Sequence, residues 1–446
     1  MPWKFLTLPK RELLRWTVVA GPIDSALQQI FSSGRRPDAC VMLSLSSLSA
    51  LLGRPSGLQV HVHTGAEALE QLGPEWRAAE EQAILPSLFV SWSYIETAWR
   101  HFREPGDQPW LVAVRRAGRL VGLLPLVLSL DRERPWRTRV LRHMGMWEGD
   151  RPGLLACEDP EQLWPLIARA LRRQRHGWDV LDLRELDEGH WLLRHPQALG
   201  PGMHQRSRPD TQAGYQRIEG DWDSYLQQRS RNTRQGYRRY QRLLQSEFGS
   251  TAIKVAQTPA DIAPAFERYL AIEQRSWKYG AEVGLWSDRR QPDFYRELLP
   301  RLAAEGRASV WLLQGDGQDL AGLVRYQWQG VAYERLSAYD PAHARHAPST
   351  LLCMTAVERL YGSGVRESDV LGLQQPLAER QAIRAWYDGM RQTYRLVSCN
   401  LLSACGMAWL LHRGLLWLGG WRRCAAVGAV MAGAAVVGVA LPELAS

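Results

Sequence analysis

Lysine and paired cysteine are what this sequence most lacks. Only four of its 55 Lys and Arg residues are lysines. An arginine bias of this kind can follow from genome composition alone, so the net charge of +9 does not by itself indicate an anionic partner. The six cysteines form no C-x-x-C pair and no Cys/His ligand spacing, which argues against a disulfide framework or a zinc site. We therefore expect no bound metal.

The first residues do not resemble a signal peptide. The start MPWKFLTLPKRELLRW has neither an apolar core nor a small-residue cleavage site, so we expect a reduced, cytoplasmic protein. A chain of 446 residues exceeds one ordinary core and predicts two or three domains. Apolar residues make up 45% and charged residues 23%, which is typical of a globular protein rather than a disordered one.

The C-terminal region carries the one long apolar run. Residues 424–441 read CAAVGAVMAGAAVVGVAL, 18 residues without a charge, and Arg422 and Arg423 precede them. A helix of this length spans about 27 Å, just enough for a bilayer. A buried terminal helix is the other interpretation. We therefore keep open an attachment to the inner membrane through residues 401–446.

Two halves of the chain repeat the same order of predicted elements. Each half has a strand, two helices, an antiparallel hairpin, a further helix and a final strand. The hairpins 111–128 and 310–328 align by eye, with turns at Ala117–Gly118 and Asp316–Gly317. Such an internal duplication predicts an extension over 1–57, α/β units over 58–214 and 215–400, and an apolar helical tail over 401–446.

Four stretches carry a resemblance to known proteins, which covers about residues 58–400. They are LPSLFVSWSYIETAW, RSRNTRQGYRRYQRLLQSEFG, EQRSWKYG and DLAGLVRYQWQGVAYERLSAYDPAHARHAPSTLL. The sequence resembles the GNAT acyltransferases, the tandem Fem-type transferases and, more closely, the CelD-type family named for cellulose biosynthesis. The resemblance implies tandem GNAT-like units, each with a mixed, largely antiparallel sheet flanked by helices. Where the CelD-type family reads Ser-Pro-Gly, this chain has Ala347-Pro348-Ser349.

The resemblance implies an acyl-CoA donor, with acetyl-CoA expected. GNAT folds hold the cofactor pyrophosphate on backbone N–H groups at a helix N-terminus, where the helix dipole favours anions. Residues 345–350 stand at that place. We predict that Arg345 contacts a phosphate, and that Ser349 or Thr350 caps the helix and contributes to cofactor binding. An ordinary capped helix is the alternative.

Acyl transfer to an amine needs a proton acceptor, and thiolate departure needs a donor. Glu273 and Trp277 are four residues apart, so on one helix they would share a face. We predict that Glu273 is the base, that Trp277 contacts the substrate and that Lys278 holds a substrate anion. In the alternative, Glu273 is solvated and Trp277 lies in the core.

Three further residues complete the predicted site. Tyr339 and Asp340 end a strand just before the phosphate loop, where the tyrosine is placed to protonate the thiolate. Asp369 begins the next strand and is a candidate substrate contact at the cleft. A plain Tyr-Asp-Pro turn is the alternative for the first two residues.

Arginines recur along the segment 224–245, with no acidic residue among them. At helical spacing, Arg231, Arg234, Arg238 and Arg242 form one stripe. Single-stranded RNA binding would call for aromatic platforms, which this segment lacks, so nucleic acid is disfavoured. We expect the helix to flank the cleft between the units, with Arg231 and Arg234 binding a phosphate or a sugar-nucleotide-like substrate. A solvated surface is the alternative.

Three functions follow from these observations. The first is an N-acetyltransferase acting on an amine of a sugar, a lipid-linked glycan or a related small molecule in polysaccharide biosynthesis. The second is an aminoacyl-tRNA-dependent transferase of the Fem type. The third is a non-catalytic GNAT scaffold at the membrane.

Overall fold

The computed structural model describes residues 57–85, 87–131, 137–146, 149–280, 284–372, 385–408 and 410–411. These residues all belong to one compact unit that begins at Gly57. The predicted extension and the apolar run 424–441 lie outside them. Among the residues that are described, no helix combines the length and apolarity needed to cross a bilayer.

The first half of the unit runs from β1 to α6. Its elements are β1 (Leu58–Thr64), α3 (Glu67–Glu80), η1 (Leu88–Val90), α4 (Trp92–Phe102), β2 (Gln108–Arg116), β3 (Arg119–Asp131), β4 (Thr138–His143), β5 (Leu155–Ala156), α5 (Pro160–Arg173), η2 (Arg175–Gly177), β6 (Val180–Asp187) and α6 (Trp191–Arg194). The long strand β7 (Met203–Arg217) follows. The sequence patterns predicted α3, α4, α5 and the β2–β3 hairpin of this half, but not β4 or α6.

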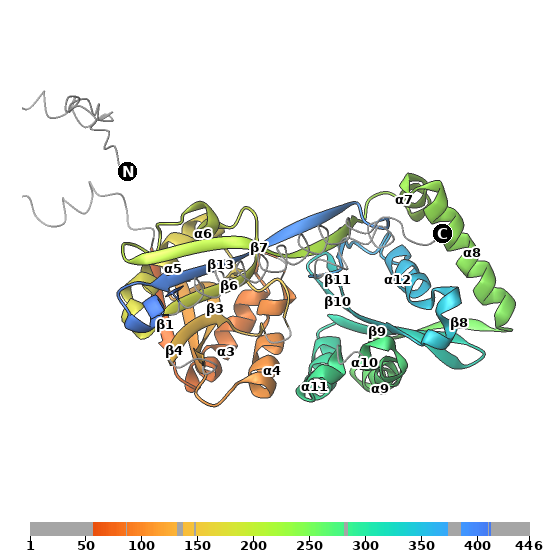
Figure 1. Ribbon diagram of the computed structural model, residues 1–446, viewed down its shortest axis with the longest axis horizontal. Coiled ribbons are helices and arrows are strands. Elements are labelled where there is room, and N and C mark those ends of the chain that lie inside the picture. The colour runs from red at the N-terminus through yellow and green to blue at the C-terminus, as the bar shows by residue number, and fades with distance from the viewer. Residues whose placement is uncertain are drawn as a thin grey trace, which may run out of the picture. The chain divides into compact units, whose positions relative to one another are not determined.

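The second half runs from α7 to β12 (Figure 1). Its elements are α7 (Trp222–Gln228), α8 (Arg231–Glu247), β8 (Thr251–Ala256), α9 (Pro259–Arg275), α10 (Trp277–Gly280), η3 (Leu285–Ser287), α11 (Arg290–Ala304), β9 (Ala308–Gly315), β10 (Gln318–Trp328), β11 (Val331–Tyr339), η4 (Pro341–His346), α12 (Pro348–Glu358) and β12 (Glu367–Asp369). The strand β13 (Gly389–Asn400) comes last.

A single 13-stranded sheet joins the two halves. The strand order is β1-β2-β3-β4-β6-β13-β7-β12-β11-β10-β9-β8, and β5 pairs with β3 off this path. The pairs β4–β6 and β11–β12 are parallel, and the other pairs are antiparallel. The last strand, β13, lies between β6 and β7, as Figure 1 shows for the blue and green strands. The predicted fold class, a mixed and largely antiparallel sheet flanked by helices, is confirmed.

The hairpin turns of the two halves have the same backbone geometry. Ala117 and Gly118 have φ of 49° and 81°, and Asp316 and Gly317 have φ of 47° and 81°. Positive φ at both central residues is the twist that a two-residue hairpin needs, and Gly supplies it without steric cost. Each turn joins a pair of buried strands. The two hairpins therefore stand at corresponding places in the two halves.

A shared core fixes the halves against each other. Helices α4 and α11 pack together, with the Phe102 and Phe294 rings 5.1 Å apart. Phe89 of the first half lies 5.7 Å from the ring of Tyr333 in the second. All four rings belong to one buried apolar cluster with members from both halves. Side-chain packing of this kind makes any cavity between the halves a preformed feature.

Candidate functional site

The sheet opens in the second half between β11 and β12. The two strands pair only from Val331 with Glu367 to Tyr333 with Asp369. Beyond that point β11 continues to Tyr339, while β12 has ended. Next come the short helix η4 and α12, which begins at Pro348. The opening thus stands beside a helix N-terminus.

The N-terminus of α12 is unprotected. Its N-cap residue is Ala347, with φ of 47°, no side chain caps it, and no acidic residue occupies its first turn. The prediction that Ser349 or Thr350 caps this helix is therefore wrong: both lie inside the first turn. Within the described chain, no backbone carbonyl accepts either of their N–H groups. Both residues are only partly buried, so these two donors are available to an anion.

The corresponding helix of the first half has the opposite chemistry. Asp159 caps α5 by accepting a hydrogen bond from the Glu161 N–H, 3.0 Å away. Glu161 adds a second carboxylate in the first turn. Two negative charges at this N-terminus repel a phosphate. Only the second half offers an open anion site at this place in the repeated unit.

Side chains around η4 are engaged in ion pairs. The Arg345 side chain is 67% exposed and pairs with Glu247 at the end of α8. Asp340 accepts a hydrogen bond from Arg275 Nε at 2.8 Å and another from the Ala342 N–H at 3.0 Å. Burial opposes the charge on Asp340, but these hydrogen bonds outweigh burial and hold its pKa below the usual value. Tyr339, the last residue of β11, is partly buried against the core of the second half.

Glu273 and Trp277 do not share a helical face, contrary to the prediction. Helix α9 ends at Arg275, so Trp277 belongs to the next turn, where it is 52% exposed. Glu273 is buried, with 1% exposure, and its Oε1 accepts the Leu285 N–H at 2.7 Å. A Cβ on Gly284 would lie only 2.4 Å from the same oxygen. Glu273 therefore fixes the segment after α10 against α9.

Lys278 reaches from α10 to the end of β11. Its Nζ donates to the Ser337 carbonyl at 2.8 Å. Burial lowers the pKa of Lys278, and the nearby Glu273 charge opposes that effect. The lysine thus lies beside the part of β11 that no longer pairs with β12.

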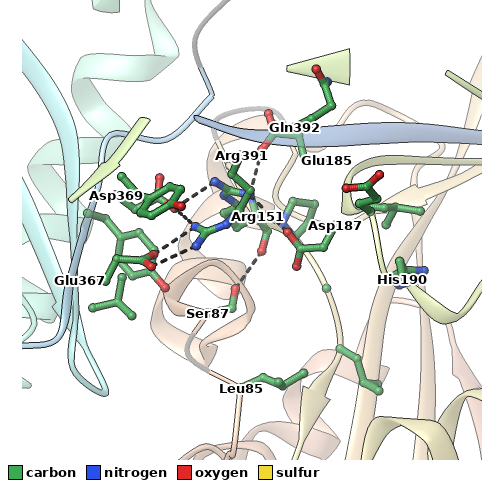
Figure 2. A pocket seen from close by; sticks show the side chains of 18 of the residues that line it. Leu85, Ser87, Arg151, Glu185, Asp187, His190, Glu367, Asp369, Arg391 and Gln392 are labelled. Carbon is green, nitrogen blue, oxygen red and sulfur yellow. Dashed lines mark hydrogen bonds and ion pairs between the residues drawn. The ribbon is translucent and has the colours of Figure 1, made fainter. Parts of the chain in front are cut away.

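A second feature of this region is a cavity of about 850 Å³ between the halves (Figure 2). One wall comes from the first half and its loops, the other from strands β7, β11, β12 and β13. Its lining includes Ser87, Arg151, Leu154, Trp164, Glu185, His190, Tyr215, Tyr333, Glu367, Asp369 and Arg391. An apolar patch beside charged groups suits a polar organic molecule.

Asp369 lines this cavity, and it ends β12 rather than beginning a strand as predicted. Its Oδ2 accepts hydrogen bonds from Arg151 Nη2 at 2.9 Å and from Arg391 Nη1 at 2.8 Å, and Figure 2 shows both arginines converging on it. Arg391 also binds Glu367 through two contacts of 3.0 Å. Burial raises the pKa of Asp369, while Arg151 and the Leu371 N–H oppose that rise.

Sequence reasoning missed the residues that the first half contributes to this cavity. Arg151 and Glu185 both have positive φ, 48° and 54°. Non-glycine residues rarely adopt this conformation, and the residues that do are concentrated at functional sites. Aligning the segment 149–153 after β4 with the segment 340–347 after β11 would have drawn attention to Asp150 and Arg151. Nothing local marks Glu185.

The arginine-rich helix does not flank the cavity. Residues of α8 are absent from its lining, and α8 packs instead on α12 and η4. Arg231 is exposed, and Arg234 makes one long contact of 3.4 Å to the Gln227 carbonyl. In the ion pairs of the described residues, none of the stripe arginines meets a carboxylate. The expected place of the stripe beside the cleft is therefore wrong.

Comparisons with known proteins agree with this fold. The sequence model for the Acetyltransferase (GNAT) domain matches residues 231–395. A crystal structure of FemX, 12% identical, covers 73% of this chain and 95% of its own length with a TM-score of 0.53. A tandem GNAT protein from the clavulanic acid biosynthesis pathway, 17% identical, covers 77% of this chain and 99% of its own, with a TM-score of 0.39.

A third similar structure is the C-terminal domain of a putative lysylphosphatidylglycerol synthetase from Agrobacterium fabrum. It is 10% identical and covers 76% of this chain and 96% of its own, with a TM-score of 0.45. No curated protein sequence matched the chain. The second half is thus similar to GNAT acetyltransferase domains, and the described part of the chain has a GNAT-like acyltransferase fold.

Proposed function

We propose that this protein transfers an acetyl group from acetyl-CoA to an amine of a sugar, a lipid-linked glycan or a related small molecule. The proposal rests on a difference between the N-termini of α12 and α5. Helix α12 begins without a capping side chain or an acidic residue, whereas Asp159 and Glu161 close α5. The second half therefore takes the phosphate-bearing donor, beside the opening between β11 and β12. A role in polysaccharide biosynthesis, as in the CelD-type family, belongs to the same proposal.

On the donor side, the Ser349 and Thr350 N–H groups bind the pyrophosphate of CoA with the support of the helix dipole. Arg345 is exposed at the same turn and can exchange Glu247 for a phosphate. Tyr339 stands at the end of β11, next to the opening, and donates a proton to the departing thiolate. Asp340 holds this corner through its hydrogen bonds to Arg275 and the Ala342 N–H.

On the acceptor side, the cavity between the halves binds the amine-bearing molecule. Asp369 and Glu367 offer negative charge, and the arginines that hold them fix their positions. Trp277, exposed near Lys278, is a candidate stacking surface for the acceptor, and Lys278 is a candidate partner for its anionic group. Arg231 and Arg234 remain candidate substrate contacts, at a distance from the cavity. Glu273 remains a candidate base, although it faces the Leu285 N–H.

The test uses Thr350→Asp, with Thr350→Asn as its matched control. A carboxylate in the first turn of α12 stabilises the ligand-free protein by about 0.3–1 kcal/mol through the helix dipole. The same charge repels the CoA phosphates, so the thermal stabilisation by acetyl-CoA is lost, while Thr350→Asn keeps it. Thr350→Asp is therefore expected to be more stable without ligand but to gain no stability from acetyl-CoA. Misfolding would instead lower the stability of the ligand-free protein, so the two causes can be told apart. Equal stabilisation of wild type and Thr350→Asp by acetyl-CoA, or none in the wild type, overturns the proposal.

The arginines of α8 favour a second candidate, an aminoacyl-tRNA-dependent transfer. Arg231, Arg238 and Arg239 are exposed on one helix that has no acidic residue in its first turn. Such a row matches the spaced phosphates of a nucleic acid. The affinity for RNA would then fall steeply with salt, with a log–log slope of about −0.7 per phosphate contacted. Salt-steep RNA binding that Arg231→Gln with Arg234→Gln weakens would replace acetyl-CoA by an aminoacyl-tRNA as donor.

A further inference from the structure

We propose that Glu185, paired with Asp150 in the first half, accepts the proton of the acceptor amine at the opening between β11 and β12. The inference rests on the proposed function and adds the residue that takes the proton. It gives the first half, whose own helix N-terminus is closed to phosphate, a chemical role in the reaction. It also places the base on different elements from Glu273.

The carboxyl pair lies directly over the end of β12. The Gly372 N–H donates to Asp150 Oδ1 at 3.3 Å. A Cβ on Gly372 would lie 2.9 Å from Glu185 Oε1 and 3.1 Å from Asp150 Oδ1. The absence of a side chain at this glycine therefore lets both carboxyl groups approach the backbone where β12 has left β11. At this point β11 and β12 no longer pair.

Glu185 also faces the cavity. It is 7% exposed and forms part of the cavity wall, on β6 (Figure 2). One oxygen, Oε2, accepts the Arg151 N–H at 2.9 Å, which holds the carboxyl group in place. Among the described residues, the other oxygen, Oε1, has one long contact of 3.4 Å, with Thr211 Oγ1. Oε1 therefore remains able to take a proton from a molecule in the cavity.

The charges around Glu185 set its proton affinity near neutrality. Burial and the Asp150 carboxylate raise the pKa of Glu185 to about 7, and the Arg151 N–H and guanidinium oppose the rise. Asp210 on β7 adds a further negative charge, and Arg335 on β11 holds Asp150 at 2.8 Å. The Asp150 and Glu185 carboxyl groups both face Gly372, so the Asp150 charge acts on Glu185 at short range. A base whose pKa is near the working pH is the most effective proton acceptor.

The reaction balances with this assignment. The acceptor enters as an ammonium ion and gives one proton to the Glu185 carboxylate, which leaves a neutral amine. The amine nitrogen attacks the thioester carbonyl, so a C–N bond forms and the C–S bond breaks. The nitrogen also loses a second proton as the amide forms, and this proton restores the one that Tyr339 has given to the thiolate. Glu185 then releases its proton through the cavity, and the products are an amide, free CoA and one proton.

The experiment compares Glu185→Gln with Glu70→Gln, an exposed carboxylate on α3 that does not line the cavity. The readouts are the pH profile of kcat/KM for an amino-sugar acceptor and the thermal shift with acetyl-CoA. In the wild type, kcat/KM falls tenfold per pH unit below about pH 7. In Glu185→Gln, kcat falls at least a hundredfold, the slope near pH 7 disappears and the acetyl-CoA shift is unchanged. Glu70→Gln matches the wild type.

Two further measurements keep the outcome decisive. Asp150→Asn removes the neighbouring charge, so the acidic limb of the profile moves to lower pH while activity at pH 8 persists. An infrared difference spectrum between wild type and Glu185→Gln detects a carboxylic acid that titrates near pH 7, independently of turnover. A folded Glu185→Gln with an unchanged pH profile, or a loss of that profile in Glu273→Gln alone, overturns the inference and leaves acetyl transfer standing. A wild type without transfer overturns both.

Discussion

Arg335 on β11 forms an ion pair with Asp150 of the first half, and the distance from Nη1 to Oδ2 is 2.8 Å. The two side chains are only 14% and 12% exposed. The same arginine donates to the Tyr295 hydroxyl on α11 at 2.9 Å. A residue of the second half thus sets the position and charge of the carboxyl group that stands beside Glu185. The proposed proton acceptor exists only because both halves are folded together.

Breaking this pair should destabilise the protein. Arg335→Leu leaves Asp150 buried without its counterion, and removal of one partner of a buried pair costs about 3–5 kcal/mol. Urea denaturation measures the change in free energy of unfolding. Arg345→Gln, which removes an exposed partner of Glu247, is the control and should change stability by less than about 0.5 kcal/mol. Equal effects of the two substitutions would contradict the structural role given to Arg335.

His143 should make the protein sensitive to acid. Burial, with a smaller effect from His190, lowers the pKa of His143 to about 3, and neither ring nitrogen has a hydrogen-bond partner in the described part of the chain. Below pH 6.5, His143 therefore binds a proton in the unfolded chain but not in the folded chain. The resulting stability is present at neutral pH and is lost as the pH falls toward 3.

The substitution His143→Phe removes this proton linkage. Between pH 7 and pH 5 it should reduce the loss of unfolding free energy by about 2 kcal/mol, since one proton is worth about 1.4 kcal/mol per pH unit. Chemical denaturation at both pH values measures the difference. His176→Gln, at an exposed position, should leave the pH dependence as it is. An unchanged slope in His143→Phe would show that the imidazole gains a partner in solution.

Ala347 should be a strained N-cap. Its φ of 47° costs an L-residue about 1 kcal/mol, which glycine does not pay. Ala347→Gly is therefore expected to stabilise the protein by about 0.5 kcal/mol, with a rise in the melting temperature. Ala342→Gly, in the same loop but without positive φ, should instead lower stability. Thermal denaturation measures the melting temperatures of both variants. A loss of stability in Ala347→Gly would rule out strain at this turn.

Arg231 occupies an unfavourable position for a cation. It is the first residue of α8, where the helix dipole disfavours positive charge. Arg231→Glu should stabilise the protein by about 0.5–1 kcal/mol, because the new carboxylate suits the helix N-terminus and can pair with Arg234 three residues on. Arg231→Gln should give a smaller gain. A higher KM for acceptor or donor in these more stable variants would support the substrate contact predicted for Arg231.

The sequence by itself determined the local features. Gly118 and Gly317 placed the turns of the two hairpins, and apolar periodicity placed α4, α5, α9 and α11. These signals are local because a turn or an amphipathic helix depends on residues a few positions apart. Asp369 was predicted beside a strand boundary for the same reason, although it ends β12 rather than beginning a strand.

Only the tertiary structure decided the rest. Strand β13 inserts between β6 and β7 by pairing with residues about 200 positions away, which no local pattern encodes. Helix α9 ends at Arg275, and the hydroxyl of Ser276 donates to the Glu273 carbonyl. Trp277 therefore does not share a helical face with Glu273, contrary to what their spacing had predicted. Asp150 and Glu185 meet over Gly372 only after both halves pack. Proton affinity depends on burial and on neighbouring charges from distant parts of the chain, so this carboxyl pair becomes visible only in the folded protein.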